Sequence, residues 1–334
     1  MQLFKISKPL SVLFLSASAL TLTLTLTLTA PALAQTAYPS KPITVIVGTP
    51  PGASDQMVRL VSDSVQAQLG QPFVVINKVG ANGVLAVNSV INASPDGYTL
   101  MFGSMSTMTM NPFVYAAAKY NATEDLVPVA QHATYPMMWV ASKKSGIRSL
   151  HEMINYGKQK PNEFFVGHIG EGGMAALIER AFFDKHGIKP TFVTYPGNAQ
   201  TVMAMQANDI QISVEPFILA MPQSRNNLFT PLAVTSTERN KTMPELPSAT
   251  ESGLSDFGMD AWFGFFAPKG TPSAIINKLN GAINKALQEP KIKNSIEDGG
   301  GVIKLLEAKA FSKVVGDDLQ RFSSMIPASG VSPK

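Results

Sequence analysis

The segment Ile43-Thr44-Val45-Ile46-Val47-Gly48-Thr49-Pro50-Pro51-Gly52-Ala53-Ser54-Asp55 contains a structural unit that the rest of the chain repeats. Its first five residues are all β-branched, which predicts a strand buried on both faces. Two prolines and a glycine end that strand, and Ser54 is the predicted N-cap of a helix. Apolar residues then recur every four positions on one helix face, at Met57, Val61, Val65 and Leu69. The segment therefore predicts a strand, a short loop and an amphipathic helix.

Similar units follow along the chain. Phe73–Ile76 and Tyr98–Phe102 are apolar runs typical of strands, and Val84–Ile91 between them predicts a helix. Phe164–Val166 predicts another strand, and after a glycine-rich loop the residues from Met174 to Phe182 form an apolar helical stripe. Strands that alternate with helices at this spacing predict an α/β fold with mostly parallel sheets flanked by helices.

The first 34 residues have the pattern of an export signal. Two lysines precede a long apolar stretch, and Ala32-Leu33-Ala34 gives the small-x-small pattern of a cleavage site. We therefore expect residues 1–34 to be a signal peptide that is cut after Ala34. A β-strand over the Leu/Thr repeat and an uncleaved membrane anchor are the alternatives, and the cleavage pattern favours export. No later apolar run approaches the length of a membrane span.

Composition excludes several kinds of chemistry. The chain of 334 residues has no cysteine, which excludes a disulfide scaffold, a thiolate metal site, a cysteine nucleophile and a lipidated N-terminal cysteine. After removal of the leader, 25 basic and 23 acidic residues remain, a net charge of +2. Lysine and arginine do not cluster with aromatic residues, so we expect no nucleic-acid partner.

The length of the mature chain predicts two lobes, because 300 residues exceed what one core usually covers. No flexible linker separates them, so the chain is expected to cross between lobes within strands, around Val127–Val140 and Leu232–Ser236. The predicted domains are residues 35–132 and 238–334 for lobe 1 and residues 133–237 for lobe 2.

Two loops are candidate anion sites, because each follows a predicted strand and opens a predicted helix. Unpaired N–H groups and the helix dipole at such a junction favour a carboxylate or phosphate, and small residues allow close approach. An ordinary strand-to-helix turn is the alternative for each. Neither loop has the spacing of a phosphate-binding or dinucleotide-binding fingerprint. The candidate ligand residues are Thr49, Ala53, Ser54 and Asp55 in the first loop, and His168, Gly170, Glu171 and Gly172 in the second.

A third candidate region follows the strand Tyr98–Phe102 and supplies the hydroxyls of Ser104, Ser106 and Thr107. In an open α/β sheet, ligands bind at the carboxyl ends of strands. We interpret the hydroxyls as hydrogen-bond donors to a ligand, with plain turn capping as the alternative. A serine nucleophile is disfavoured, because the nucleophile-elbow pattern and a histidine at a recognisable spacing are both missing.

Glu215 completes the candidate site, because it ends the apolar run Ile210–Val214 just before a proline. A solvated loop carboxylate is its alternative interpretation. The four histidines are scattered without close pairs, so we expect no metal site, and no cofactor is indicated. Four methionines near the hydroxyl region are expected to fill the core, with a soft apolar wall beside a ligand as the alternative: Met101, Met105, Met108 and Met110.

The mature chain resembles the receptors of tripartite tricarboxylate transporters, the Bug family, from Tyr38 to about Pro333. The most specific matching segment is Ser94-Pro95-Asp96-Gly97-Tyr98-Thr99-Leu100, which leads into Gly103-Ser104 and Asn111-Pro112. Further matching segments are Tyr38-Pro39-Ser40-Lys41-Pro42-Ile43, Gly70-Gln71-Pro72, Leu232-Ala233-Val234-Thr235-Ser236, Trp262-Phe263-Gly264 and Ala267-Pro268-Lys269-Gly270-Thr271-Pro272.

The resemblance implies a two-lobed, type II-like periplasmic binding protein that closes like a flytrap on a small carboxylate. The lobes are expected to be joined by crossing strands. The resemblance also implies delivery to membrane permease subunits, no catalysis, and a monomer in the periplasm. Its ligand positions correspond to Thr49–Asp55, Ser104–Thr107, His168–Gly173 and Glu215. A periplasmic sensor that feeds a two-component system is the alternative function, and an exported serine hydrolase using Ser104 or Ser106 is disfavoured.

Several residues depart from the family's pattern. Ala53 replaces a second glycine in a first loop that is one residue shorter, and His168 stands where serine is common. Glu171 and Glu215 replace asparagine and aspartate. Because a carboxylate repels an anion and attracts a hydrogen-bond donor, our hypothesis is that the solute need not be a polycarboxylate and can carry a donor or an apolar ring.

Overall fold

The computed structural model describes residues 38–169, 173–195, 197–253 and 258–328. Its backbone contacts divide the chain into two units, Met1–Tyr38 and Pro39–Lys334. The predicted signal peptide, residues 1–34, lies outside the described residues, as do the candidate ligand residues Gly170, Glu171 and Gly172. Among the described helices, none combines the length and the apolar character that a bilayer crossing requires.

Strands and helices alternate through most of the second unit, as predicted. The strands are β1 (Ile43–Val47), β2 (Phe73–Asn77), β3 (Thr99–Ser104), β4 (Leu126–Ser142), β5 (Phe165–Ile169), β6 (Thr191–Tyr195), β7 (Ile212–Pro216), β8 (Phe229–Val234) and β9 (Asp260–Pro268). The helices are α1 (Ala53–Leu69), α2 (Val84–Ile91), α3 (Asn111–Val114), α4 (Leu150–Gln159), α5 (Met174–Lys185), α6 (Asn198–Ala207), α7 (Phe217–Arg225), α8 (Ser273–Ala286), α9 (Pro290–Asp298) and α10 (Ala308–Ala328). The predicted bounds of β1 and α2 are confirmed.

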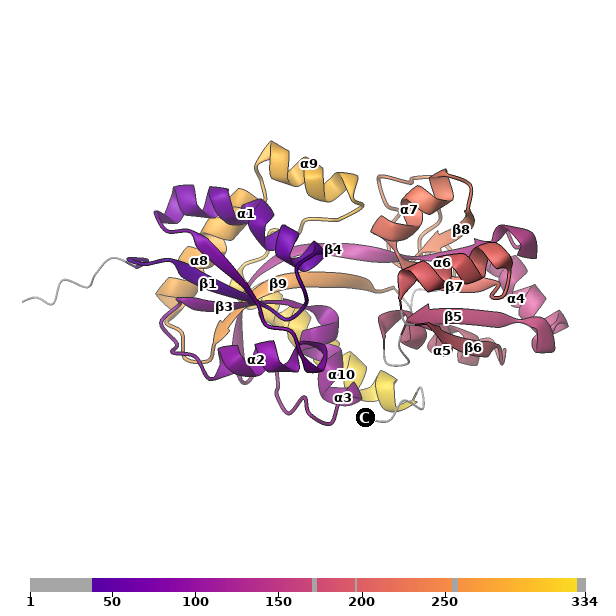
Figure 1. The fold of residues 1–334 in the computed structure, drawn as a ribbon, viewed down its shortest axis with the longest axis horizontal. Coiled ribbons are helices and arrows are strands. Elements are labelled where there is room, and N and C mark those ends of the chain that lie inside the picture. Colours follow the sequence, from indigo (N-terminus) through magenta and orange to yellow (C-terminus); the bar gives the residue numbers. More distant parts are fainter. Residues whose placement is uncertain (1–37, 170–172, 196, 254–257, 329–334) are drawn as a thin grey trace, which may run out of the picture. The chain divides into compact units, whose positions relative to one another are not determined.

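The strands form one mixed sheet in the order β2-β1-β3-β9-β4-β7-β5-β6, with β8 also paired to β4. β1 is parallel to β2 and β3, and β5 is parallel to β6 and β7. β4 is antiparallel to β9 over its first part and to β7 and β8 over its last part. β4 is therefore common to two groups of strands, and it runs beside β9 for most of the length of β9 (Figure 1).

The two candidate crossing segments both lie in or next to strands. Val127–Val140 lies within the long strand β4, as expected of an ordered crossing strand. Leu232–Ser236 contains the end of β8, which pairs with the last part of β4. A strand that the sequence did not single out as a crossing, β9, runs beside the first part of β4.

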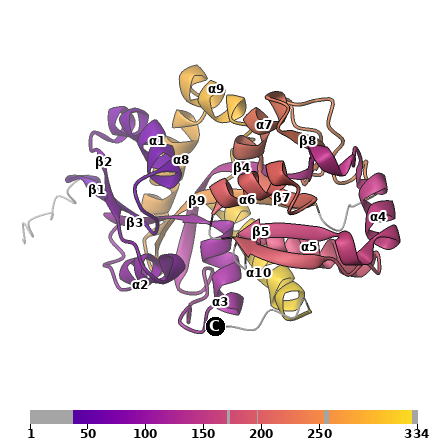
Figure 2. The ribbon, with the colours of Figure 1, turned by 45° about the vertical axis from the view of Figure 1, so that its right-hand side comes forward.

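Each group of strands is covered by helices that carry the apolar stripes of the sequence. α1 contacts α8 and β2, and α10 contacts β4. α5 and α6 both contact β5 and β7, and they lie on either side of these strands (Figure 2). The methionines near the hydroxyl region are core residues, as expected, since Met101, Met105, Met108 and Met110 are at most 1% exposed. They fill the space between β3 and the helices that follow it.

Candidate functional site

The carboxyl ends of the parallel strands carry the predicted ligand residues in two separate sets. We call the residues after β1 and β3 the first half-site: Thr49, Ala53, Ser54, Asp55, Ser104, Ser106 and Thr107. We call the described candidate residues near the ends of β5 and β7 the second half-site: His168 and Glu215. The predicted ligand residues Gly170, Glu171 and Gly172 lie outside the described residues. Within each set the strands are parallel, so their carboxyl ends lie at one edge of that group of strands, which is where α/β proteins bind ligands. The two groups run in opposite directions, because β3 is parallel to β4 and β7 is antiparallel to it.

The first half-site begins at the junction of β1 and α1. Gly52, not the predicted Ser54, is the N-cap of α1, and it makes no side-chain capping bond. Ser54 therefore lies inside the first helical turn, where its N–H group is one of those that lack an intrahelical acceptor. The prediction of the cap was wrong because the loop reaches helical geometry two residues earlier than the hydroxyl pattern suggested.

Asp55 is fixed by a neighbour on the same helix. Its Oδ2 accepts a hydrogen bond from Nε of Arg59 at 2.7 Å, and the Asp55 side chain is only 10% exposed. A carboxylate in the first turn also interacts favourably with the positive end of the helix dipole. Asp55 therefore has a structural partner in addition to its predicted ligand role.

Three segments meet behind this junction at very short range. A Cβ on Gly48 would lie 2.9 Å from the Cα of Gly83, and a Cβ on Gly83 would lie 3.1 Å from Cγ2 of Thr107. Gly83 also has a φ of 88°, a conformation that favours glycine. The segments after β1 and before α2 are thus packed backbone to backbone, and the Thr107 side chain from the segment after β3 packs against Gly83. This close packing requires glycine at the first two positions.

The hydroxyl region is an ordered helical segment rather than the expected loop. Ser106–Met110 forms one wide helical turn that continues into α3. The Ser104 hydroxyl accepts a hydrogen bond from the Thr107 N–H at 3.2 Å and lies 3.2 Å from the Thr107 hydroxyl. The Tyr120 hydroxyl donates to the Thr107 carbonyl. Ser104 thus caps the segment and still has a hydroxyl that can contact a solute.

The second half-site contains a fully buried histidine. The His168 side chain has no exposed surface, and its Nδ1 lies 2.9 Å from Oε2 of Glu179. Its Nε2 lies 3.3 Å from the Thr194 hydroxyl. This placement differs from the predicted direct ligand contact, because the imidazole points into the protein, toward α5, rather than toward the edge of the sheet. The predicted strand ended at Val166 with a loop from Gly167, but β5 continues to Ile169, so His168 lies within the strand. The glycine pattern also carried no information on the side chain's direction.

Glu215 is a nearly buried carboxylate at the end of β7. It is 3% exposed, Oε2 accepts a bond from the Asn198 amide at 2.6 Å, and Oε1 accepts one from the Ser213 hydroxyl at 2.7 Å. Burial raises the pKa of Glu215, and the two hydrogen bonds oppose that shift. Glu215 lines a cavity of about 140 Å³ between α6 and α7, together with apolar residues such as Val202 and Leu219. The alternative of a solvated loop carboxylate is excluded by this burial.

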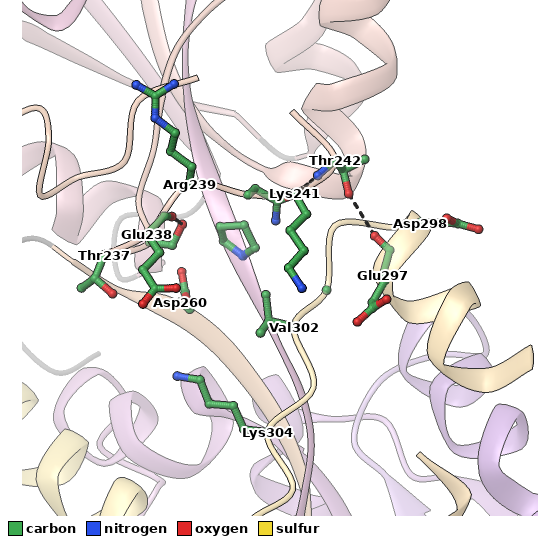
Figure 3. Close-up of a pocket in the computed structure, with 14 residues that line it drawn as sticks. Thr237, Glu238, Arg239, Lys241, Thr242, Asp260, Glu297, Asp298, Val302 and Lys304 are labelled. Carbon is green, nitrogen blue, oxygen red and sulfur yellow. Dashed lines mark hydrogen bonds between the residues drawn. The ribbon is translucent and has the colours of Figure 1, made fainter. Parts of the chain in front are cut away.

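A larger cavity of about 440 Å³ lies elsewhere, beside the strands β4 and β9 (Figure 3). Lys241 and Lys304 reach into it, and the carboxylates of Glu238 and Asp260 lie near each other on its wall (Figure 3). Burial raises the pKa of Asp260 to about 6. None of the predicted ligand residues lines this cavity. It therefore adds no support to the predicted site.

Sequence reasoning missed Asn198, Ser213 and Glu179, which hold the second half-site. Asn198 begins α6 directly after Gly197, so it follows a third strand–glycine–helix junction that the pattern of the first loop could have revealed. Glu179 gave no such signal, because a single acidic residue inside an amphipathic helix normally faces solvent. Among the described residues, no group of three or more histidines and acids is placed to hold a metal ion.

Comparison with known proteins identifies the family. Residues 57–331 match the tripartite tricarboxylate transporter family receptor. The chain belongs to this receptor family. It is 30% identical to the protein BugT of Bordetella pertussis, over 91% of this chain and 94% of BugT. Proteins of this family are periplasmic substrate-binding receptors rather than enzymes. The predicted membership of this chain in the Bug family of receptors is therefore confirmed.

Solved structures show the same fold. The R. palustris protein Rpa4515 with adipate has a TM-score of 0.76 and 25% identity, covering 89% of this receptor and all of that chain. MatC (Rpa3494) from Rhodopseudomonas palustris with bound malate has a TM-score of 0.72 and 27% identity, covering 86% of this receptor and all of that chain. The predicted α/β fold of a periplasmic binding protein is thus confirmed.

Proposed function

We propose that this receptor captures a small organic solute with at least one carboxylate between two lobes and delivers it to the permease subunits of a tripartite tricarboxylate-type transporter. The observation that carries the proposal is the pair of half-sites, each at the carboxyl ends of strands that open into helices. The ligands named in the two solved structures, adipate and malate, are both dicarboxylates. N–H groups at helix starts suit such anions without requiring a cationic side chain.

The lobes in this proposal are those expected from the sequence, residues 35–132 with 238–334 and residues 133–237. The long strand β4 passes through the boundary at residues 132 and 133, and β9 lies beside it. Solute bound to both half-sites stabilises a closed arrangement of the lobes, which is the form that a permease recognises. The receptor acts as a monomer, exported by a signal peptide that is cut after Ala34, and has no catalytic function.

Glu215 is the specificity-determining part of the proposal. An anionic group placed against a buried carboxylate is repelled, whereas a hydroxyl, amide or ammonium group can donate to it. The apolar wall of the neighbouring cavity accepts an alkyl or ring portion of the same solute. The solute class is therefore a carboxylate with a hydrogen-bond donor or an apolar body away from its anionic end.

The function is tested by native mass spectrometry of the mature protein, which weighs any solute that copurifies, followed by a thermal-shift screen of carboxylates. A solute at about 100 times its Kd stabilises the folded state by about 2.7 kcal/mol and raises Tm by about 5 °C. We expect such a rise for at least one small carboxylate. Absence of any rise, with a copurified molecule that has no carboxylate, contradicts the proposal.

The role of Glu215 is tested by comparing Glu215→Gln with a control at an exposed acid, Glu163→Gln, whose side chain is 71% exposed. Glu215→Gln is expected to weaken the physiological solute by at least about tenfold while improving binding of citrate. The control should change neither affinity. Tight citrate binding by the wild type that is unaffected by Glu215→Gln contradicts this role.

A further inference from the structure

The strands β5 and β7 separate at the position where the second half-site begins. They pair as parallel neighbours at only two positions, Val166 with Ile212 and Gly167 with Ser213. By contrast, β5 and β6 remain paired to the last residue, Ile169 with Tyr195. The next residues along β5 and β7, His168 and Val214, are therefore not joined to each other as a further rung of the ladder.

The Glu179 carboxylate lies between His168 and Val214, where β5 and β7 are no longer paired. Glu179, which comes from α5, accepts a hydrogen bond from the Val214 N–H on Oε1 at 2.9 Å. Its other oxygen, Oε2, lies 2.9 Å from Nδ1 of His168. Both side chains are completely buried. Glu179 thus connects the two strands through its two oxygens where the backbone ladder has ended.

The Glu179 carboxylate supplies an acceptor for the buried Val214 N–H, which would otherwise lack a hydrogen bond. On its other side β7 is paired with β4, where Val214 lies opposite Trp139. The N–H of Val214 is directed away from that ladder, and a buried N–H without an acceptor is rare in folded proteins. The bridge also extends beyond β5, since Nε2 of His168 lies 3.3 Å from the Thr194 hydroxyl on β6.

The charges around Glu179 are few. Burial raises its pKa, the nearby Glu215 carboxylate raises it further, and the Val214 N–H and Arg180 oppose the shift. A hydrogen bond between Nδ1 of His168 and Oε2 needs one proton between the two atoms. The resulting hydrogen bond is stronger than it would be in water, because the protein interior has a low dielectric constant.

We propose that Glu179 is a positioning residue for solute binding. Its two oxygens connect β5 and β7 just beyond the last backbone-paired residues of these strands. The carboxylate therefore sets the distance between His168 and Val214. The ends of these strands, Ile169 and Glu215, are thereby held at the spacing that the second half-site requires. The connection to the solute rests on the proposed function, whereas the connection to strand spacing stands on the geometry alone.

Amide hydrogen exchange of the mature protein tests the strand-spacing part without any solute. Glu179→Leu removes both bridging oxygens and is expected to speed exchange of the Val214 N–H, and of peptides covering residues 165–169 and 212–216, by at least tenfold. Glu179→Gln retains an oxygen for Val214 and an amide for His168, so exchange should stay within about threefold of wild type. Asp318→Leu is the matched control, because Asp318 accepts a 2.6 Å bond from Trp262 far along the chain and touches neither strand.

The same variants test the solute part, with malate and adipate as probes. Glu179→Leu is expected to weaken the bound dicarboxylate at least tenfold, Glu179→Gln to restore affinity to within about threefold, and Asp318→Leu to leave Kd unchanged. If Glu179→Leu does not fold, wild-type exchange decides, because Val214 must then be among the slowest amides of β7. Unchanged exchange at Val214 in Glu179→Leu, or fast exchange there in the wild type, overturns the positioning role. If neither probe binds the wild type, the carboxylate that raises Tm in the thermal-shift screen replaces them as the probe. If no carboxylate binds the wild type, the proposed function is what fails, and the exchange data still decide the role of Glu179.

Discussion

In the first half-site the segments are held together by backbone packing, whereas in the second they are held together by buried ionisable side chains. Gly48, Gly83 and Thr107 meet at van der Waals distance, and neither glycine can carry a Cβ without a shift of its neighbours. In the second half-site, His168, Glu179 and Glu215 are at most 3% exposed and make their contacts through charged or titratable groups.

This difference shows that strand ends in one sheet can be held in place by different means, by close packing in the first half-site and by buried hydrogen bonds in the second. Steric packing depends on side-chain volume and is insensitive to pH. A buried carboxylate bridge tolerates small changes in volume but depends on both partners being present. Substitutions and pH should therefore affect the two half-sites in different ways.

The largest effect is expected for Glu179→Leu in the second half-site. The substitution removes both bridging oxygens, and each buried polar group that loses a hydrogen bond costs about 1–3 kcal/mol of unfolding free energy. Urea denaturation followed by circular dichroism measures this loss. The double variant His168→Leu with Glu179→Leu should recover part of it, since Nδ1 of His168 is then no longer buried beside a leucine. A loss below about 1 kcal/mol in the single variant would show that the bridge contributes little.

The next largest effect is expected for Gly48→Val in the first half-site. The new side chain would collide with the backbone of Gly83, which cannot move as a flexible side chain does. Overpacking of this kind costs about 1–3 kcal/mol, and we expect a value near the upper end. The control is Gly281→Ala on α8, where an added Cβ meets nothing within 4 Å. Equal stability of Gly48→Val and Gly281→Ala would refute the steric account.

A smaller, pH-dependent effect is expected for His132, which lies on β4 in contact with the strand that leads to the hydroxyls of the first half-site. Burial lowers the pKa of His132, which contacts Phe102 on β3, to about 4. The unfolded chain then binds more protons than the folded one between about pH 4 and 6.5, so stability is complete above pH 6.5 and falls on acidification. Between pH 7.5 and 5 this loss is about 2 kcal/mol. The stability difference between wild type and His132→Phe, measured by urea at both pH values, should change by that amount.

The carboxylates act with the opposite sign. The raised pKa of Glu215 makes the folded state bind protons more strongly, so its contribution is lost as the pH rises. Acid should therefore loosen the region around His132 before it loosens the second half-site, which peptide-level hydrogen exchange at pH 5 can resolve. Earlier loosening around β5 and β7 would contradict this assignment.

The smallest effect is expected for Arg59→Gln on α1. The Arg59 side chain is 61% exposed, so solvent and salt screen its bond to Asp55. We expect Tm to stay within about 1 °C of wild type and solute affinity to stay within about twofold. A large loss of affinity would show that Asp55 depends on Arg59 for its position at the first half-site.

The α/β fold and most strands could be predicted from the sequence, because β-branched runs and apolar residues at four-residue spacing indicate which segments are buried. For β1 and α2 this pattern predicted both ends of the element. It could not predict which of β8 and β9 runs beside the first part of β4, because both strands are apolar and pairing is decided by the whole sheet.

The candidate site was predictable where it depends on loops and not where it depends on side-chain direction. The glycine-containing junction after β1 and the strand end at Glu215 follow from local patterns. The inward direction of His168 depends on Glu179, eleven residues later on a helix, and no local pattern pairs these two residues. Likewise, Ser54 lost its predicted capping role to Gly52 because the loop geometry, rather than side-chain chemistry, fixes where α1 begins.

In the proposed function, one small carboxylate contacts both half-sites at once. This double contact is tested by isothermal titration of the solute found by native mass spectrometry into wild type, Gly48→Val, Glu179→Leu and the control Gly281→Ala. We predict that either half-site variant alone weakens binding at least tenfold while the control binds like wild type. A carboxylate that binds tightly to wild type and equally tightly to both half-site variants would contradict the claim.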